Sequence, residues 1–199
     1  MSKKLFITGL VAMVIVTSVA MAKLPKNGTV ASAPTFGDII AQAQAASADY
    51  FLKLDGIDGE STDESHKGEI DVMSWSWGET QIGTSAGGGG GAGKVSMQDV
   101  HFTMSMGKAT PKLMLAVAKG EHIRDAIITA RKGSGREARE YLVIKLENVM
   151  VSSYQTGASS GQLPTEQVSL NFAKIQWTHT ADDGTVQTGG WDVEGNTEI

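Results

Sequence analysis

The chain contains no cysteine, which excludes disulfide bonds, thiolate metal sites and cysteine nucleophiles. It also lacks an excess of positive charge. Residues 1–48 carry four lysines and one aspartate, which leaves 13 basic and 21 acidic side chains, a net charge of −8, in residues 49–199. This excess of negative charge repels the phosphate backbone of a nucleic acid, so we do not expect nucleic acid as a partner.

Motifs that would support catalysis are missing as well. The four histidines, His66, His101, His122 and His179, do not show the spacing of converging zinc ligands. No Gly-x-Ser-x-Gly elbow is present to anchor a hydrolase triad. Acidic residues are scattered over predicted loops and strand faces, and nothing in their pattern supports a catalytic pair. We therefore expect no enzyme activity, no cofactor and no metal.

The apolar run at the N-terminus is short. Lys3 and Lys4 precede a stretch, 5–20, that is almost wholly apolar, and Ala20-Met21-Ala22 ends it with small residues. This order predicts a secretory signal peptide over residues 1–22, cleaved between Ala22 and Lys23. A membrane anchor is the alternative, but the run falls short of the ~20 residues that span a bilayer.

Residues 23–48 form a separate segment. Its first part is rich in small and turn residues, with Pro25, Asn27-Gly28 and Pro34, and is typical of a linker. Residues 36–48 could form a short helix of marginal stability. We place the start of the folded domain at Asp49, so that the domain covers residues 49–199.

From Asp49 the hydrophobic pattern has a period of two, which predicts β-strands. The expected strands cover 50–54, 69–77, 95–106, 127–130, 141–151 and 168–177. The last of these should contain a bulge near Ala173. Residues 177–181 and 185–193 should form a hairpin around Asp183-Gly184. One segment differs: Thr110 as N-cap, Pro111 in the first turn and Gly120 after the last turn predict a helix. Its apolar side, Leu113, Met114 and Val117, should pack on a sheet. Together these elements predict a mainly β fold, a closed or nearly closed barrel with one short helix.

A glycine run, SAGGGGGAGK over 85–94, partly matches a phosphate-binding loop. The match fails at Val95, where a Ser or Thr hydroxyl should reach a metal ion. It also fails in context, because the residues after Lys94 alternate like a strand, whereas such a loop opens a helix. A nucleotide site is therefore not expected here.

Trp75 and Trp77 are two residues apart, so both side chains should lie on one face of a strand. They could form a platform on which sugars stack. The preferred interpretation is a core or interface face, because Val72 and Met73 already make both faces of the strand partly apolar.

Six blocks of residues 49–199 occur in the order and spacing of a known family. They are DYFLKLDGIDGESTDESHKGEIDVMSWSWG (49–78), GGGGGAGKVSMQDVHFT (87–103), TPKLMLAVAKGEH (110–122), AREYLVIKLENVMVSSYQTG (138–157), PTEQVSLNFAKIQW (164–177) and GGWDV (189–193). On these blocks the chain resembles the Hcp (hemolysin-coregulated) tube protein of type VI secretion. The resemblance implies a β-barrel of two antiparallel sheets with a flanking helix, and six-membered rings that stack into a hollow, effector-carrying tube. It also implies partners: other copies of the chain, effectors in the lumen and other parts of the secretion machine.

The same resemblance implies a role for the glycine run as the contact between stacked rings. By position this ring-stacking loop consists of Thr84, Ser85, Ala86, Gly87, Gly88, Gly89, Gly90, Gly91, Ala92 and Gly93.

Residues 1–48 have no counterpart in typical members of that family, which carry no signal peptide. A working signal would send the chain out through the periplasm, with no stable membrane anchor after cleavage. Two functions therefore remain open at this point: a tube subunit and effector carrier, or an exported β-barrel binding module that keeps the fold without the injection role.

Overall fold

The computed structural model describes residues 48–81, 94–133 and 138–199. All of these residues belong to one compact unit. The predicted signal peptide with its Ala22–Lys23 cleavage site, the linker before Ala48 and the ring-stacking loop Thr84–Gly93 lie outside the described residues. Within the described ranges, no helix is long and apolar enough to cross a membrane.

The described residues form eleven strands and one helix. In chain order they are β1 (Ala48–Leu54), β2 (Ile70–Ser76), β3 (Glu79–Gln81), β4 (Val95–Met97), β5 (Val100–Ser105), α2 (Thr110–Lys119), β6 (His122–Lys132), β7 (Arg139–Gly157), β8 (Thr165–Asn171), β9 (Lys174–Thr180), β10 (Val186–Asp192) and β11 (Thr197–Glu198).

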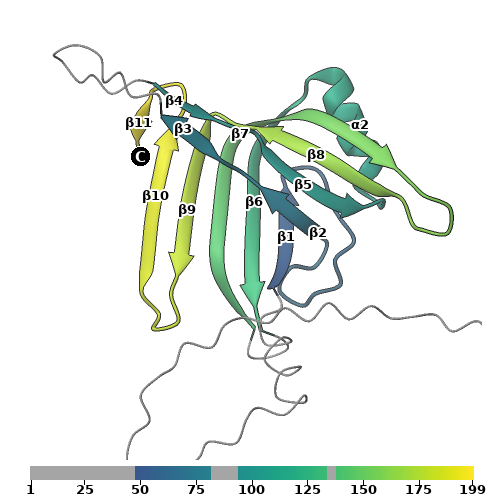
Figure 1. The fold of residues 1–199 in the computed structure, drawn as a ribbon, viewed down its shortest axis with the longest axis horizontal. Coiled ribbons are helices and arrows are strands. Elements are labelled where there is room, and N and C mark those ends of the chain that lie inside the picture. The colour runs from purple at the N-terminus through teal and green to yellow at the C-terminus, as the bar shows by residue number, and fades with distance from the viewer. Residues whose placement is uncertain (1–47, 82–93, 134–137) are drawn as a thin grey trace, which may run out of the picture. The chain divides into compact units, whose positions relative to one another are not determined.

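Six of these strands close a barrel (Figure 1). The main sheet runs β11-β10-β9-β7-β6-β1-β2-β5-β8, and β8 returns to pair with β7, so that β7, β6, β1, β2, β5 and β8 form a ring of antiparallel strands. Strands β9, β10 and β11 extend the sheet beyond the barrel, and β3 with β4 forms a separate two-stranded sheet. The prediction of a mainly β barrel with one flanking helix is confirmed.

The long strand β7 belongs to both halves of the barrel. Its first half pairs with β6 and β9, and its second half, from Met150 to Gly157, pairs with β8. The change occurs where Asn148 has a positive φ of 51° and the β7–β8 register shifts between Val151 and Ser153. Such irregularities bend a strand and let it turn from one sheet into the other.

Segment 168–177, predicted as one bulged strand, is interrupted where the bulge was expected. β8 ends at Asn171 and β9 begins at Lys174, yet both pair with β7, one after the other. Phe172 and Ile175 are both buried although they are three positions apart, an offset that puts side chains on opposite faces of an uninterrupted strand. The interruption therefore reverses the alternation and keeps both side chains in the core.

The predicted strand over 95–106 is also two strands. Val95–Met97 pairs with β3 in the small sheet, and Val100–Ser105 joins the barrel between β2 and β8. The apolar positions shift by one between the two strands, from Val95 and Met97 to Val100 and Phe102, where the pairing partner changes.

The helix has the predicted length and a left-handed residue, Gly120 (φ 61°), at its C-cap. Two details were wrong. Ala109, not Thr110, is the N-cap residue, and Met114 is 49% exposed, while Leu113 and Ala116 are buried. Leu113 and Ala116 join the single hydrophobic core that fills the barrel, so the helix packs against it along a narrower face than predicted.

Candidate functional site

One outer surface of the barrel carries polar side chains without charge, and we call it the uncharged wall. It lies on β2, β5, β8 and the second half of β7, whose inward side chains, such as Phe102, Val168 and Leu170, are buried in the core. The wall consists of Ser74, Ser76, His101, Thr103, Ser153, Gln155, Gln167 and Ser169. These residues surround a shallow cavity of about 440 Å³.

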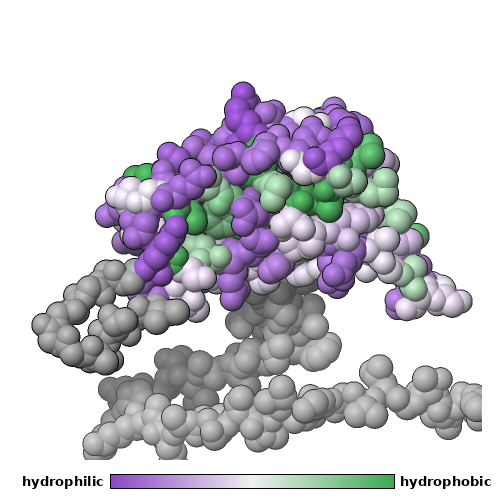
Figure 2. Space-filling view, turned by 90° about the horizontal axis from the view of Figure 1, so that it is seen from above, coloured by the Kyte–Doolittle hydropathy of each residue, from purple (hydrophilic) through white to green (hydrophobic). Residues whose placement is uncertain are grey.

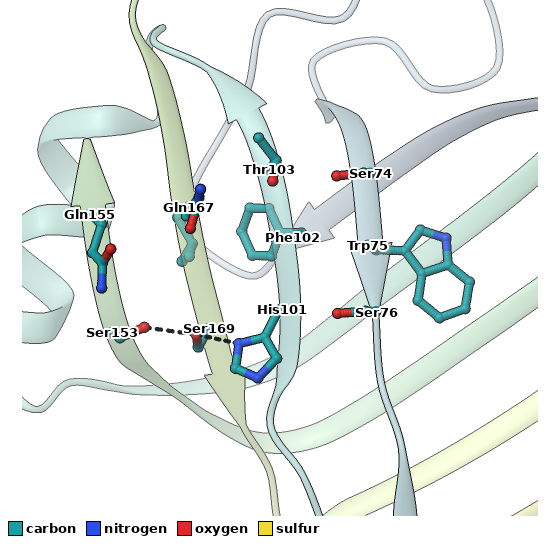
Figure 3. Close-up of a pocket in the computed structure, with 11 residues that line it drawn as sticks. Ser74, Trp75, Ser76, His101, Phe102, Thr103, Ser153, Gln155, Gln167 and Ser169 are labelled. Atoms are coloured by element: carbon teal, nitrogen blue, oxygen red, sulfur yellow. Dashed lines mark hydrogen bonds between the residues drawn. The ribbon is translucent and has the colours of Figure 1, made fainter. Parts of the chain in front are cut away.

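The strand registers arrange the wall in two rows that cross all four strands (Figure 3). Ser76, His101, Ser169 and Ser153 lie opposite one another in one row, and Ser74, Thr103, Gln167 and Gln155 in the next. Within the first row, His101 Nδ1 lies 2.7 Å from Ser169 Oγ, and the Ser153 hydroxyl donates to Ser169 Oγ at 2.7 Å. Neighbouring hydroxyls thus satisfy one another and hold the row in place.

The Ser169–His101 contact is not a catalytic dyad. Ser169 is only 6% exposed, and its oxygen is already engaged by two neighbours. In the described ranges, the nearby acid Asp99 contacts Ser152 and Asn171, and the structure gives it no contact with His101. The row therefore lacks the oriented third group that activates a nucleophile.

A buried carboxylate supports the wall from the inside. Glu166 on β8 is 0% exposed, and its carboxylate accepts hydrogen bonds from the Tyr154 hydroxyl at 2.7 Å and the Thr110 hydroxyl at 3.0 Å. Burial raises the pKa of Tyr154, and the hydrogen bond to Glu166 raises it further. Glu166 thereby connects the start of α2 to β7 and β8.

At one end of the wall, tryptophan side chains from β2 and the residue after it contact a tryptophan of β9. The rings of Trp75 and Trp77 lie 5.9 Å and 5.3 Å from that of Trp177, and all three pack against the core. Because these rings are partly buried against one another, the interpretation of Trp75 and Trp77 as a core face is confirmed. A register shift between Val72 and Ser74 puts Trp75 on the same side of β2 as Val72, facing the core.

The opposite outer surface, on β1, β6 and the first half of β7, is charged, and we call it the charged wall. Its side chains are Asp49, Lys53, Asp125, Arg131, Lys145 and Glu147. Lys145 Nζ lies 2.6 Å from Glu147 Oε1, and this contact raises the pKa of Lys145. Arg131 reaches Asp63 at 2.7 Å and Asp49 at 3.1 Å, and its hydrogen bond holds the pKa of Asp63 below the usual range.

Three of the four histidines are exposed. His101, His122 and His179 are exposed, whereas His66 is 5% exposed and stacks on Phe51 with ring centroids 4.1 Å apart. Over the described ranges, no three His, Asp or Glu side chains converge as a metal site.

The uncharged wall was missed in the sequence. The sequence does contain a pattern that points to this wall, since Ser, Thr or Gln recurs at alternate positions in each of the four strands. Only the registers show that these positions align across strands far apart in the chain.

Comparison with known proteins identifies the family. A family model described as "Type VI secretion system effector, Hcp" matches residues 51–179. Protein hcp1 of Pseudomonas aeruginosa is 44% identical over 158 residues, covering 75% of this chain and 98% of that protein.

Solved structures agree. The crystal structure of Hcp1 from Salmonella typhimurium matches with a TM-score of 0.65 and 33% identity, covering 77% of this chain and 99% of that one. A type VI secretion system effector from Yersinia pestis matches with a TM-score of 0.63 and 31% identity, covering 73% and 100%.

The family consists of secreted structural proteins rather than enzymes, and its members assemble as hexameric rings. The range matched by the family model, 51–179, covers the barrel strands, the helix and all but the last residue of β9. The chain therefore belongs to the Hcp family of type VI secretion system tube proteins.

Proposed function

We propose that six copies of this chain surround a lumen lined by the uncharged wall, and that effector proteins travel through the tube inside it. The supporting observation is the wall itself: a polar surface with no Asp, Glu, Lys or Arg among its lining residues, on a domain of net charge −8 over residues 49–199. A wall without fixed charge neither repels nor traps a cargo of either sign. The exposed hydroxyl and amide groups stay hydrated when no cargo is present.

The edges of the wall suit ring closure. On one side, Ser74–Ser76 of β2 pairs with β5, and on the other, Ser153–Gly157 of β7 pairs with β8. Among the described residues, no strand pairs with the outer edge of either segment. Unpaired edges are ready to accept another strand. Since they lie at opposite ends of the four-stranded wall, edge-to-edge pairing between copies would be head-to-tail and could close a ring.

Electron microscopy of the purified full chain tests ring formation: rings with six-fold symmetry support the proposal, and isolated protomers contradict it.

The placement of the wall can be tested with single cysteines, because the chain has none of its own. A bulky maleimide polymer should react slowly with Gln167→Cys once tubes form. It should react readily with the control Gln176→Cys, an exposed position that pairs with Lys145 of the charged wall. Equal protection of both positions, or faster reaction at Gln167→Cys, would refute the assignment of the lumen.

We propose further that Thr84–Gly93 joins stacked rings. Glycine runs can bring backbone very close to a neighbour, and six loops presented together strengthen a weak single contact. Deleting Gly87–Gly91 should leave rings intact and abolish tubes, as measured by size-exclusion chromatography with light scattering. Tubes formed by the deletion variant, or measurable ATP binding by the wild type, would overturn this role.

For the N-terminus we propose export through the periplasm with cleavage between Ala22 and Lys23, motivated by Lys3-Lys4, the apolar run and the small residues before Lys23. N-terminal sequencing of secreted protein should begin at Lys23. A mature chain that retains Met1 and stays in the cytoplasm would contradict this proposal and indicate direct secretion by the type VI machine.

A further inference from the structure

A cleft lies where the β9–β10 extension meets the small β3–β4 sheet (Figure 1). It has a volume of about 380 Å³, within the range of about 300–1,000 Å³ that is typical of small-molecule sites. We call it the aromatic cleft, because Trp77, Trp177 and Trp191, three of the four tryptophans in the chain, line it. Apolar residues on the face shown in Figure 2 form small patches among polar ones, which is normal for a protein surface. Three indole rings around one concave site are not.

Strand pairing explains why the cleft is open. Trp177 on β9 pairs with Gly189 on β10, so both lie on one face of the extension. Trp191 is two residues beyond Gly189 on β10 and lies on the same face. A tryptophan can cover a glycine on the neighbouring strand. Here, however, a β-carbon at Gly189 would meet no atom within 4 Å outside its chain neighbours. The space above Gly189 is therefore empty, and two tryptophans flank it.

Unpaired hydrogen-bond donors are concentrated at this cleft. In the described ranges, five buried side-chain nitrogens lack a hydrogen-bond partner, and three of them are the indole nitrogens of Trp77, Trp177 and Trp191. The fourth tryptophan, Trp75, does not line the cleft and is not among the five. Because a buried tryptophan N–H usually has a partner, the aromatic cleft lacks acceptors that the protein itself does not supply.

One charged residue, Glu79 on β3, also lines the cleft. Its side chain is exposed, and within the described part of the chain its carboxylate has no hydrogen bond or ion pair. No Lys, Arg or His is among the lining residues, so an anionic ligand would find no counter-charge. A carboxylate accepts hydrogen bonds and an indole N–H donates them. The ligand that suits the cleft is therefore uncharged, has an apolar face and carries both donors and acceptors.

We propose that the aromatic cleft binds a neutral pyranose sugar, as one unit of an oligosaccharide. The apolar face of the sugar ring stacks on an indole, hydroxyl oxygens accept from indole N–H groups, and a hydroxyl donates to Glu79. A quaternary ammonium ion would also suit the rings and the carboxylate, but it has no acceptor for the N–H groups. Because water does not reach these nitrogens in the free protein, a ring must tilt when the sugar binds. This activity goes beyond tube formation and does not depend on it.

Isothermal titration calorimetry of the purified full chain tests the site, with neutral trisaccharides of glucose, galactose, mannose and N-acetylglucosamine as probes. We expect at least one of them to bind and to change the tryptophan fluorescence. Gly189→Val should abolish this binding, because the new side chain enters empty space and fills the cleft without a clash. The matched control is Gly157→Val at the end of β7, where a β-carbon also meets no atom within 4 Å. This control should bind like the wild type.

A second variant decides the matter if Gly189→Val does not fold. Glu79→Gln changes an exposed side chain without changing its size, so the melting temperature should stay the same. The affinity for the sugar should fall about tenfold, because a hydrogen bond to a charged group is lost.

The outcomes separate this site from the proposed function. Binding that Gly189→Val abolishes, Glu79→Gln weakens and Gly157→Val leaves unchanged supports the sugar site. No binding of any of the four sugars, or binding that survives both cleft substitutions, overturns it. Binding of tetramethylammonium with no binding of sugar overturns the choice of ligand. None of these results bears on ring formation, which electron microscopy tests separately.

Discussion

The two outer walls of the barrel are built from the same kind of strand and differ in chemistry. On the charged wall, ion pairs recur: Arg131 with Asp49 and Asp63, and Lys145 with Glu147. On the uncharged wall, the outward lining residues carry hydroxyl, amide and imidazole groups, and His101 is the one titratable group among them.

Burial does not explain this difference, because exposed side chains occur on both walls. Charges are tolerated where a surface meets bulk water, and their absence from all the residues that line the cavity points to a constraint other than solubility. The barrel thus has one face suited to solvent and one suited to a confined space. The predictions below compare the core behind the uncharged wall with the walls themselves.

The largest effect is expected at the inward side of the uncharged wall. Phe102 is 3% exposed and lies in the core, so Phe102→Ala should lower the free energy of unfolding by about 3–5 kcal/mol. Gln167→Ala, on the outward side of the neighbouring strand, should change it by less than about 0.5 kcal/mol. Urea unfolding of both variants measures the difference. Similar losses would mean that the outward side chains are packed and that the two sides of the wall are not distinct.

A somewhat smaller effect is expected from the carboxylate behind the wall. Glu166→Ala leaves the Tyr154 and Thr110 hydroxyls without their acceptor and should cost about 3 kcal/mol. Glu147→Ala, which removes an exposed carboxylate of the charged wall, should cost less than about 1 kcal/mol. Thermal unfolding compares the two, and a cost for Glu147→Ala equal to that for Glu166→Ala would contradict the account.

The smallest effect concerns acid stability of the charged wall. Because the hydrogen bond from Arg131 lowers the pKa of Asp63 in the folded state, the stabilisation is complete above the unfolded pKa, about 4, and is lost as the pH falls through the folded value. The melting temperature of the wild type should therefore fall more steeply below about pH 4 than that of Asp63→Asn. Parallel curves for the two proteins would show that the pair contributes nothing.

Much of the fold could be predicted from the sequence, because alternation is a local signal. The period of two located most strands, and Pro111 with Gly120 located the helix. The failures have a common cause. The bulge at Met73 and the choice of partner on either side of the break between Met97 and Val100 depend on which strand lies alongside. The local pattern marks the break by a shift of the apolar positions, but it does not identify the partner strand. For the same reason the uncharged wall could not be assembled before the registers were known.

The capping error at Thr110 has a related origin. A threonine before a proline has the local signature of an N-cap, but here its hydroxyl accepts from the Gly107 N–H at 2.9 Å and donates to Glu166. A tertiary partner 56 residues away engaged the hydroxyl that local capping would have used.

A cryo-electron microscopy reconstruction of tubes assembled from the full chain tests the central claim most directly, since it shows which wall borders the lumen. The account predicts that Ser76, His101 and Gln167 line the channel and that Arg131 and Lys145 lie on the outside. A channel lined by Arg131, Lys145 and Glu147, with the uncharged wall turned to solvent, would contradict it.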